Sequence, residues 1–96
     1  MKVLWTDSAV AQLQAIHDYI AQTSPEYALR IVDRLTRRSI QIASFPFSGR
    51  MVPEHELKEV REVIEGRYRI IYLVESVQVQ VLAVIHAARE PFSPLE

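Results

Sequence analysis

The sequence predicts a single α+β domain over residues 1–96, in which a helical hairpin packs on one face of a small, mainly antiparallel sheet in the order β-α-α-β-β-β. After a short first strand, two segments with helical hydrophobic periodicity are followed by three segments rich in β-branched residues. The 96 residues, 49% hydrophobic and 24% charged, have the size and composition of one globular domain. We expect a strand over 1–6, the hairpin over 8–43, a three-stranded meander over 59–89 and a tail over 90–96.

The first strand and first helix are predicted from local signals. Lys2 to Thr6 is partly β-branched and aromatic, which favours a strand, and Thr6 or Asp7 can then cap a helix. In that helix, about Ser8 to Gln22, apolar residues recur at steps of four, three and four and form one face. They are Ala9, Leu13, Ile16 and Ile20.

The second helix, about Pro25 to Ala43, has the stronger start signal. Ser24 is a typical N-cap residue, and proline is favoured at the first helical position. The apolar face contains Ala28, Val32, Leu35 and Ile42, and the opposite face contains Arg30, Arg34, Arg37 and Arg38. Arginines opposite an apolar stripe are typical of any solvated helix face, and the alternative is a cationic contact surface for a partner.

Three strands are predicted after a loop over Phe45 to Pro53, which contains two prolines and a glycine. The strands and turns are Glu59–Ile64, a turn at Glu65 and Gly66, Arg67–Val74, a turn at Glu75 and Ser76, and Val77 to about Ala87. For the first turn we favour a three-residue loop that includes Arg67, because it directs Val60 and Ile64 toward the helices and Arg61 and Val63 toward the side of Arg69.

Strict alternation in the last strand predicts one buried face and one bare face. The residues expected under the helices are Val77, Val79, Val81, Ala83 and Ile85, opposite Tyr68, Ile70 and Tyr72. The residues expected on the other side are Arg67, Arg69, Ile71, Leu73, Leu82, Val84 and His86. That apolar and cationic surface needs a partner, unless the chain's own segment from Pro91 to Leu95 covers it.

Charge and motifs exclude several classes of function. A formal charge of −1 and a pI near 6.3 give no general attraction to nucleic acid, so we expect no direct sequence-specific nucleic-acid binding. No nucleotide-binding glycine motif, HExxH motif or cysteine is present, and we expect no metal and no cofactor. Without cysteine or a membrane-length apolar run, the chain is expected to be cytoplasmic, with no membrane partner.

One set of residues could support metal-free RNA cleavage. That reaction needs a base, an acid and a cation for the phosphate within hydrogen-bond reach. Glu62, His86 and either Arg69 or Arg89 are the only set that the predicted strands bring near one another. The same residue types on adjacent strands also form structural salt-bridge networks, which is the commoner arrangement.

Short motifs in order along the chain carry a resemblance to a known family. They are Phe45-Pro46, Ser48-Gly49-Arg50, Val52-Pro53-Glu54, Val60-Arg61-Glu62, Tyr68-Arg69-Ile70-Ile71-Tyr72 and His86-Ala87-Ala88-Arg89-Glu90. Together with the predicted element order, this set resembles the RelE/ParE toxin superfamily of bacterial type II toxin-antitoxin systems over nearly the whole chain. The loop and the His-x-x-Arg ending look most like the ParE branch.

The resemblance implies a toxin that inhibits DNA gyrase by protein binding, without catalysis, and that a cognate antitoxin neutralises. A homodimer or a heterotetramer with antitoxin is compatible with the same exposed surface. Departures from the nuclease relatives favour this branch, because no Tyr follows Arg89 and Ala87 stands where another branch has a Tyr beside the His. The expected binding residues are Arg61, Arg67, Arg69, His86 and Arg89 on the sheet side, and Arg30, Arg34 and Arg38 on the hairpin.

Two other functions remain open from the sequence. One is a RelE-like, ribosome-dependent mRNA endonuclease in which Arg69 and Arg89 bind phosphate and His86 or Glu62 transfers protons. The other is an interaction module that only binds an antitoxin.

Overall fold

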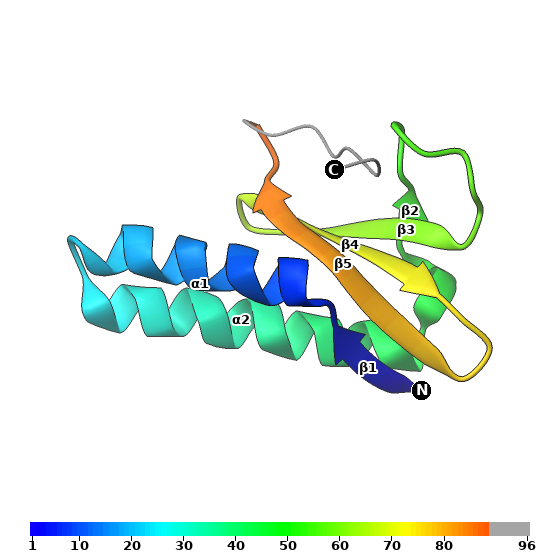
Figure 1. Ribbon diagram of the computed structural model, residues 1–96, viewed down its shortest axis with the longest axis horizontal. Helices are drawn as coiled ribbons and strands as arrows, with labels where there is room; N and C mark the ends of the chain where they lie inside the picture. The colour runs from blue at the N-terminus through cyan, green and yellow to red at the C-terminus, as the bar shows by residue number, and fades with distance from the viewer. Residues whose placement is uncertain (89–96) are drawn as a thin grey trace.

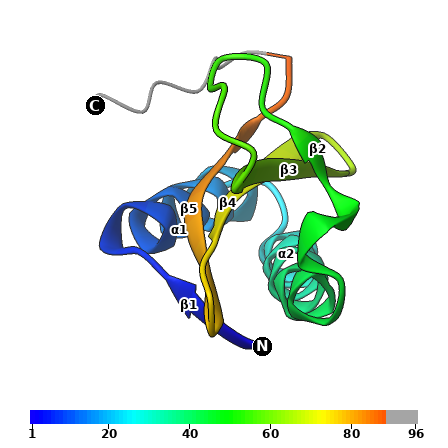
Figure 2. The ribbon, with the colours of Figure 1, turned by 90° about the vertical axis from the view of Figure 1, so that its right-hand side faces the viewer.

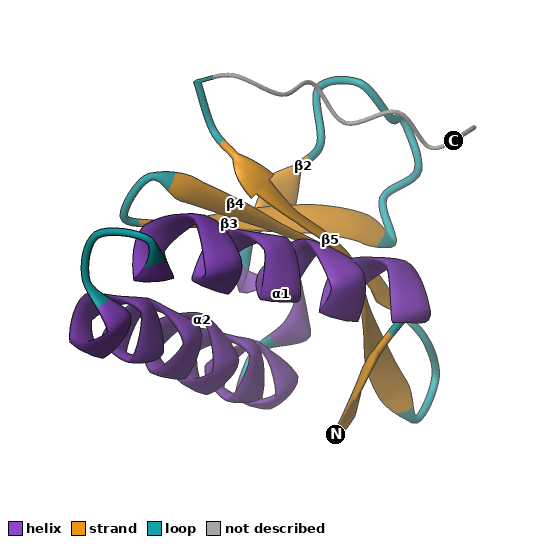
Figure 3. Cartoon of the chain, turned by 60° about the vertical axis from the view of Figure 1, so that its left-hand side comes forward, coloured by secondary structure: helices purple, strands orange, loops and turns teal. Residues whose placement is uncertain are grey.

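A computed structural model gives the structure of the chain, and it describes residues 1–88. The elements are β1 (Lys2–Trp5), α1 (Asp7–Ala21), α2 (Pro25–Ser44), a short 3-10 helix (Pro46–Ser48), β2 (Arg50–Met51), β3 (Val60–Glu65), β4 (Tyr68–Val74) and β5 (Gln78–His86). The two helices lie together on one side of the sheet (Figures 1 and 3). The predicted α+β class is therefore confirmed, with one addition, because β2 falls in a segment predicted to be a loop.

The sheet has the order β1-β5-β4-β3-β2. β1 runs parallel to β5, and the other neighbours are antiparallel. Beyond the end of β1, two side chains hydrogen-bond to the backbone of β5: Thr6 Oγ1, at the cap of α1, donates to Leu82 O (3.4 Å), and Gln12 Oε1, within α1, accepts from Val84 N (2.9 Å). In the described part of the chain, no helix is long and apolar enough to cross a membrane.

Both helices begin at the predicted capping residues. The Thr6 hydroxyl accepts from Ala9 N (3.1 Å), and the Ser24 hydroxyl accepts from Tyr27 N (3.2 Å), with a proline at the start of α2. Each cap satisfies a backbone N–H that has no partner within its helix. The caps fix where the hairpin starts and turns, and so which helical faces meet the sheet.

Strand β5 carries a bulge that overturns the predicted alternation. Ile71 pairs with Ala83 but Tyr72 pairs with Val81, so Leu82 is an extra residue. One extra residue exchanges the two faces of everything beyond it. Val79, Val81 and Val84 belong to the cluster under the helices, whereas Ala83 and Ile85 belong to a second cluster on the far side. The unbroken apolar face predicted for this strand is therefore wrong.

The predicted turns are also displaced. Glu65 pairs with Tyr68, which leaves Gly66 and Arg67 as a two-residue turn, and Glu75 N donates to Gln78 O (2.9 Å), which moves the next turn to Ser76 and Val77. The favoured β3 register is wrong, since Val60 packs on the far side and Val63 under the helices. Burial of aliphatic side chains alone favoured that register, but β3 also buries Glu62.

The far side of the sheet is not bare, contrary to the prediction. Its cluster consists of Val52, Val60, Ile71, Ala83 and Ile85, with Leu73 packed against it. Val52 comes from the loop between β2 and β3, and Figure 2 shows that loop on the side of the sheet away from the helices. The proposed cover by Pro91 to Leu95 lies outside the described residues.

A buried tyrosine fixes the start of β2. The Tyr72 hydroxyl donates to Pro46 O (2.7 Å) and accepts from Gly49 N (3.1 Å), while burial raises the pKa of Tyr72 and keeps the hydroxyl able to donate. A Cβ on Gly49 would lie 2.5 Å from both Glu62 O and Tyr72 Oη, so only glycine allows this close approach.

We expect Tyr72→Phe to destabilise the domain by about 1–3 kcal/mol, because Gly49 N and Pro46 O lose their partner in a buried place. Urea unfolding measures this difference. Tyr19→Phe is the control, since Tyr19 is 66% exposed and its change should stay within about 0.5 kcal/mol. Equal stability of the two variants would contradict the role given to Tyr72.

Candidate functional site

Four charged side chains are joined by hydrogen bonds on the far side of the sheet. We name Arg50, Glu54, Glu62 and Arg69 the arginine–glutamate cluster. Glu62 Oε1 accepts from Arg69 Nε (3.1 Å) and Nη2 (2.6 Å), and Glu62 Oε2 accepts from Arg50 Nε (2.8 Å). Glu54 accepts from Arg69 Nη1 and Nη2, both at 2.9 Å, in a bidentate pair.

Two members of the cluster are buried, whereas the Arg50 side chain is 66% exposed. Glu62 is 1% exposed and Arg69 is 7% exposed. Hydrogen bonds to Glu54 raise the pKa of Arg69 despite its burial, so the guanidinium stays charged. Among the described residues, no buried side-chain nitrogen or oxygen lacks a hydrogen-bond partner. Complete pairing of this kind is what allows charges to be buried without a large penalty.

The structure brings together only part of the predicted proton-transfer set. Glu62 and Arg69 are in contact, but the bulge in β5 places His86 opposite Tyr68, with the two rings edge to face and their centroids 5.8 Å apart. His86 and Tyr68 line a pocket on the helix side of the sheet. The predicted position Arg89 lies outside the described residues.

The remaining predicted binding arginines are dispersed. Arg34 Nη2 lies 3.3 Å from Glu65 Oε2 and Arg38 Nε lies 3.9 Å from Glu65 Oε1, so both face a carboxylate at the end of β3. Arg30 stacks over the Tyr27 ring at 5.7 Å. Arg61 stacks over the Phe47 ring at 5.0 Å and donates to two backbone carbonyls.

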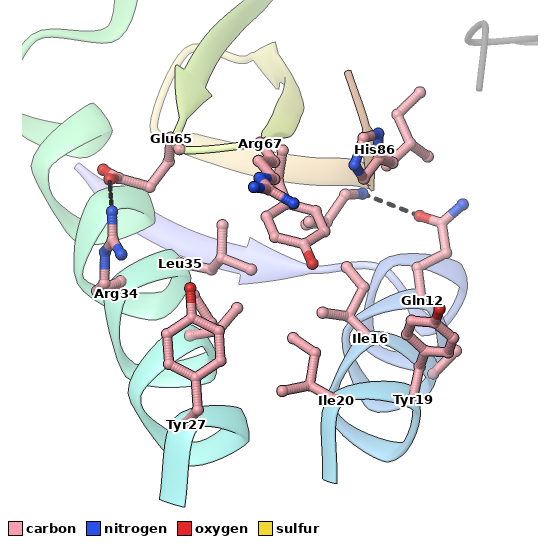
Figure 4. A pocket seen from close by; sticks show the side chains of 16 residues that line it. Gln12, Ile16, Tyr19, Ile20, Tyr27, Arg34, Leu35, Glu65, Arg67 and His86 are labelled. Atoms are coloured by element: carbon pink, nitrogen blue, oxygen red, sulfur yellow. Dashed lines mark hydrogen bonds and ion pairs between the residues drawn. The ribbon is translucent and has the colours of Figure 1, made fainter. Parts of the chain in front are cut away.

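Arg67, like Arg34, lines a groove between the hairpin and the end of the sheet (Figure 4). The cavity has a volume of about 800 Å³. Tyr19, Tyr27 and Tyr68 come from α1, α2 and β4, and we name the cavity the tyrosine groove. The other lining residues used below are Ile16, Ile20, Ile31, Leu35, Arg34, Glu65 and His86.

The groove has the chemistry of a protein-binding surface. Its volume is in the range of ligand sites, and its wall combines aliphatic and aromatic side chains with a few polar groups at the rim. Tyr19 is 66% exposed and Tyr27 is 45% exposed, and large exposed aromatic side chains are enriched where proteins bind one another. In residues 1–88, no three His, Asp or Glu side chains are grouped to hold a metal ion.

Comparison with known proteins identifies the family. The family described as "ParE toxin of type II toxin-antitoxin system, parDE" matches residues 3–91. The chain belongs to the ParE toxin family. It is a toxin of the type II kind within the ParE/RelE superfamily, and the resemblance drawn from its motifs is confirmed.

Some relatives of this ParE family chain are named RelE, and others are named ParE. The "Toxin RelE2" of Caulobacter vibrioides is 39% identical over 88 residues, covering 92% of this chain and 97% of the relative. A solved structure titled "Chromosomal ParDE TA system from P. aeruginosa" has a TM-score of 0.74 and 27% identity, covering 90% of this chain and 95% of the other. A chain of the RelBE2 toxin-antitoxin complex from Mycobacterium tuberculosis shares the fold, with a TM-score of 0.65 and 21% identity. The match covers 88% of this chain and 95% of the other.

Sequence reasoning missed the tyrosine groove in this ParE family chain. Tyr19 and Tyr27 lie outside the apolar stripes of their helices, and Tyr68 was assigned to the core of the sheet. A usable signal was present, since two tyrosines flank the short connection at Thr23 and Ser24. Sequence reasoning also missed Glu54 as a partner of Arg69. Glu54 lies in a loop, and no strand pairing predicts which residue a loop side chain will contact.

We expect Glu62→Gln to destabilise the ParE family fold by about 3 kcal/mol or more, because two arginines lose their shared, buried carboxylate. Chemical denaturation at neutral pH measures the loss. Glu65→Gln is the matched control: it removes the surface pairs with Arg34 and Arg38, each of which should contribute less than about 1 kcal/mol. A similar decrease in the free energy of unfolding for both variants would show that the buried carboxylate of Glu62 stabilises the fold no more than a surface carboxylate does.

Proposed function

We propose that this chain inhibits DNA gyrase by binding it and that a cognate antitoxin neutralises it. One observation carries the choice of binding over catalysis: Glu62, which pairs with Ile71 of the far-side cluster, and His86, which lines the groove, lie on opposite sides of the sheet. Arg69 is in addition held by two carboxylates. General acid–base catalysis needs its groups within hydrogen-bond reach of one substrate. Match to the ParE family supports gyrase as the target.

The antitoxin is proposed to occupy the tyrosine groove with an amphipathic helix. Two structural neighbours come from toxin-antitoxin systems, one of them titled as a complex. Helices bind grooves through apolar residues three and four positions apart, and the groove offers aliphatic side chains for them. Arg67, at its rim, has no carboxylate partner among the ion pairs of the described residues, so acidic residues on the antitoxin helix would complement it.

An mRNA endonuclease is the second candidate, and the name of the Caulobacter vibrioides relative favours it. It would require Arg69 to release a carboxylate in order to hold a phosphate. It would also require an acid and a base other than the separated pair Glu62 and His86. These requirements make it the weaker proposal.

With purified gyrase, we expect the chain to abolish supercoiling and to accumulate cleaved plasmid, and prior mixing with antitoxin to prevent both effects. Agarose gels of plasmid topoisomers measure this. A parallel reaction with ribosomes and mRNA separates the two candidates. Unchanged topology at excess toxin, together with codon-phased mRNA breaks, would reject gyrase and support the endonuclease.

The double change Tyr19→Ala and Tyr27→Ala should weaken antitoxin binding about 30-fold or more, because buried aromatic anchors often contribute 2 kcal/mol or more to an interface. Titration calorimetry with the antitoxin measures the affinity. Ile40→Ala is the control, since Ile40 is 61% exposed on α2 and does not line the groove. Unchanged affinity of the tyrosine variant would place the antitoxin elsewhere.

A further inference from the structure

We propose that the antitoxin helix lies in the tyrosine groove with its C-terminal end at Arg67, and that Arg67 and His86 hydrogen-bond the last backbone carbonyls of that helix. This inference rests on the proposed function, in which the groove holds an amphipathic antitoxin helix. It adds the direction of the helix and the groups that bind its end.

The two ends of the groove differ in chemistry. Figure 4 shows the charged side chains at the end next to the strands, and tyrosines and isoleucines toward the connection between the helices. Of the described residues that line the groove, those with charged or imidazole side chains are Arg34, Glu65, Arg67 and His86. With the histidine neutral, two arginines against one glutamate give this end a net charge of +1, which favours the negative end of a partner.

The two arginines differ in whether they are paired. Arg34 Nη2 lies 3.3 Å from Glu65 Oε2, whereas Arg67 has no carboxylate partner among the ion pairs of residues 1–88. The backbone of Arg67 is nevertheless fixed. It shares a two-residue turn with Gly66, whose φ of 60° suits glycine, and its carbonyl accepts from Ala87 N (2.8 Å). An anchored turn therefore presents the guanidinium at the groove.

His86 offers a second donor beside Arg67. The two residues line the tyrosine groove and also a second, smaller cavity. His86 Nδ1 accepts from Ala88 N (3.2 Å). A ring nitrogen that accepts carries no proton, so the neutral imidazole has its proton on Nε2 and can donate there.

These donors match the chemistry of a helix C-terminus. The last four carbonyls of a helix have no partner within it, and that end carries a partial negative charge. Arginine and histidine side chains bind such carbonyls. A helix N-terminus would instead bring N–H groups and a partial positive charge toward Arg67.

The opposite end of the groove favours neither direction. There α1 ends at Ala21 and α2 begins at Pro25, so the negative end of one helix lies beside the positive end of the other (Figure 3). Their partial charges oppose each other. The direction of a bound helix is therefore decided at the end that holds Arg67 and His86.

The direction can be measured with spin labels, because the chain has no cysteine. Gln22→Cys places a label beside the connection between the helices, and Ala88→Cys places one beyond the end of β5; both positions are exposed. In complexes with ¹⁵N-labelled cognate antitoxin, we expect the label at position 88 to broaden the amide signals of the C-terminal end of the antitoxin helix. The label at position 22 should broaden those of its N-terminal end.

The reverse pattern would overturn the inferred direction and leave the groove as the antitoxin site. If neither label broadens the helix, or if both broaden the same end, this inference falls, and in the first case the proposed location of the antitoxin falls with it. Circular dichroism of each labelled variant first establishes that it is folded.

The capping role has its own measurement, titration calorimetry with the antitoxin. Arg67→Gln should weaken binding about fivefold, whereas Arg67→Lys, which keeps the charge, should weaken it less than about twofold. Arg67 is exposed, so the fold should be retained. Arg37→Gln is the matched control, because Arg37 pairs with Asp33 and does not line the groove, and it should bind as the wild type does.

Unchanged affinity of Arg67→Gln would overturn the cap. The effect of Arg67→Gln should also persist when the acidic side chains in the last turn of the antitoxin helix are changed to amides, since the proposed acceptors are backbone carbonyls. Disappearance of the effect in that antitoxin would assign Arg67 to a side-chain ion pair and overturn the cap, without affecting the groove as the antitoxin site.

Discussion

The buried carboxylate of Glu62 is the constraint on which half of the sheet depends. A carboxylate removed from water must be paired and hydrogen-bonded on both oxygens, and Arg50 and Arg69 meet this need from the two neighbouring strands. The same requirement sets the register of β3, brings a two-residue edge strand into the sheet and supplies, through Arg69, the anchor for the loop. Local backbone preferences alone would not determine the β3 register, the position of the edge strand or the position of the loop.

The sequence predicts the helices well because their signals are local. Capping at Thr6 and Ser24 and the apolar stripes depend on residues within a few positions of one another, and the structure confirms both caps. Strand register depends instead on pairing between distant segments. A single extra residue at Leu82 exchanges the faces of Ala83 and Ile85. Neither the composition nor the periodicity of the sequence indicates where such a bulge will form.

The residues of the candidate site also differ in how far the sequence predicts them. Glu62 and Arg69 could be expected together because they lie on adjacent strands, and a structural salt-bridge network was one interpretation of them. His86 was misplaced because its face depends on the bulge. The tyrosine groove joins three separate elements, so it exists only once the hairpin has been positioned against the end of the sheet.

The parallel pairing of β1 with β5 bears on how the chain is made. Lys2 lies opposite Gln78 and Trp5 opposite Val81, so the first strand synthesised must wait for the last one to leave the ribosome. Contacts between such distant segments slow folding. A newly made chain therefore has no finished sheet until β5 has been synthesised, and the tyrosine groove, which β5 helps to line, forms only after that.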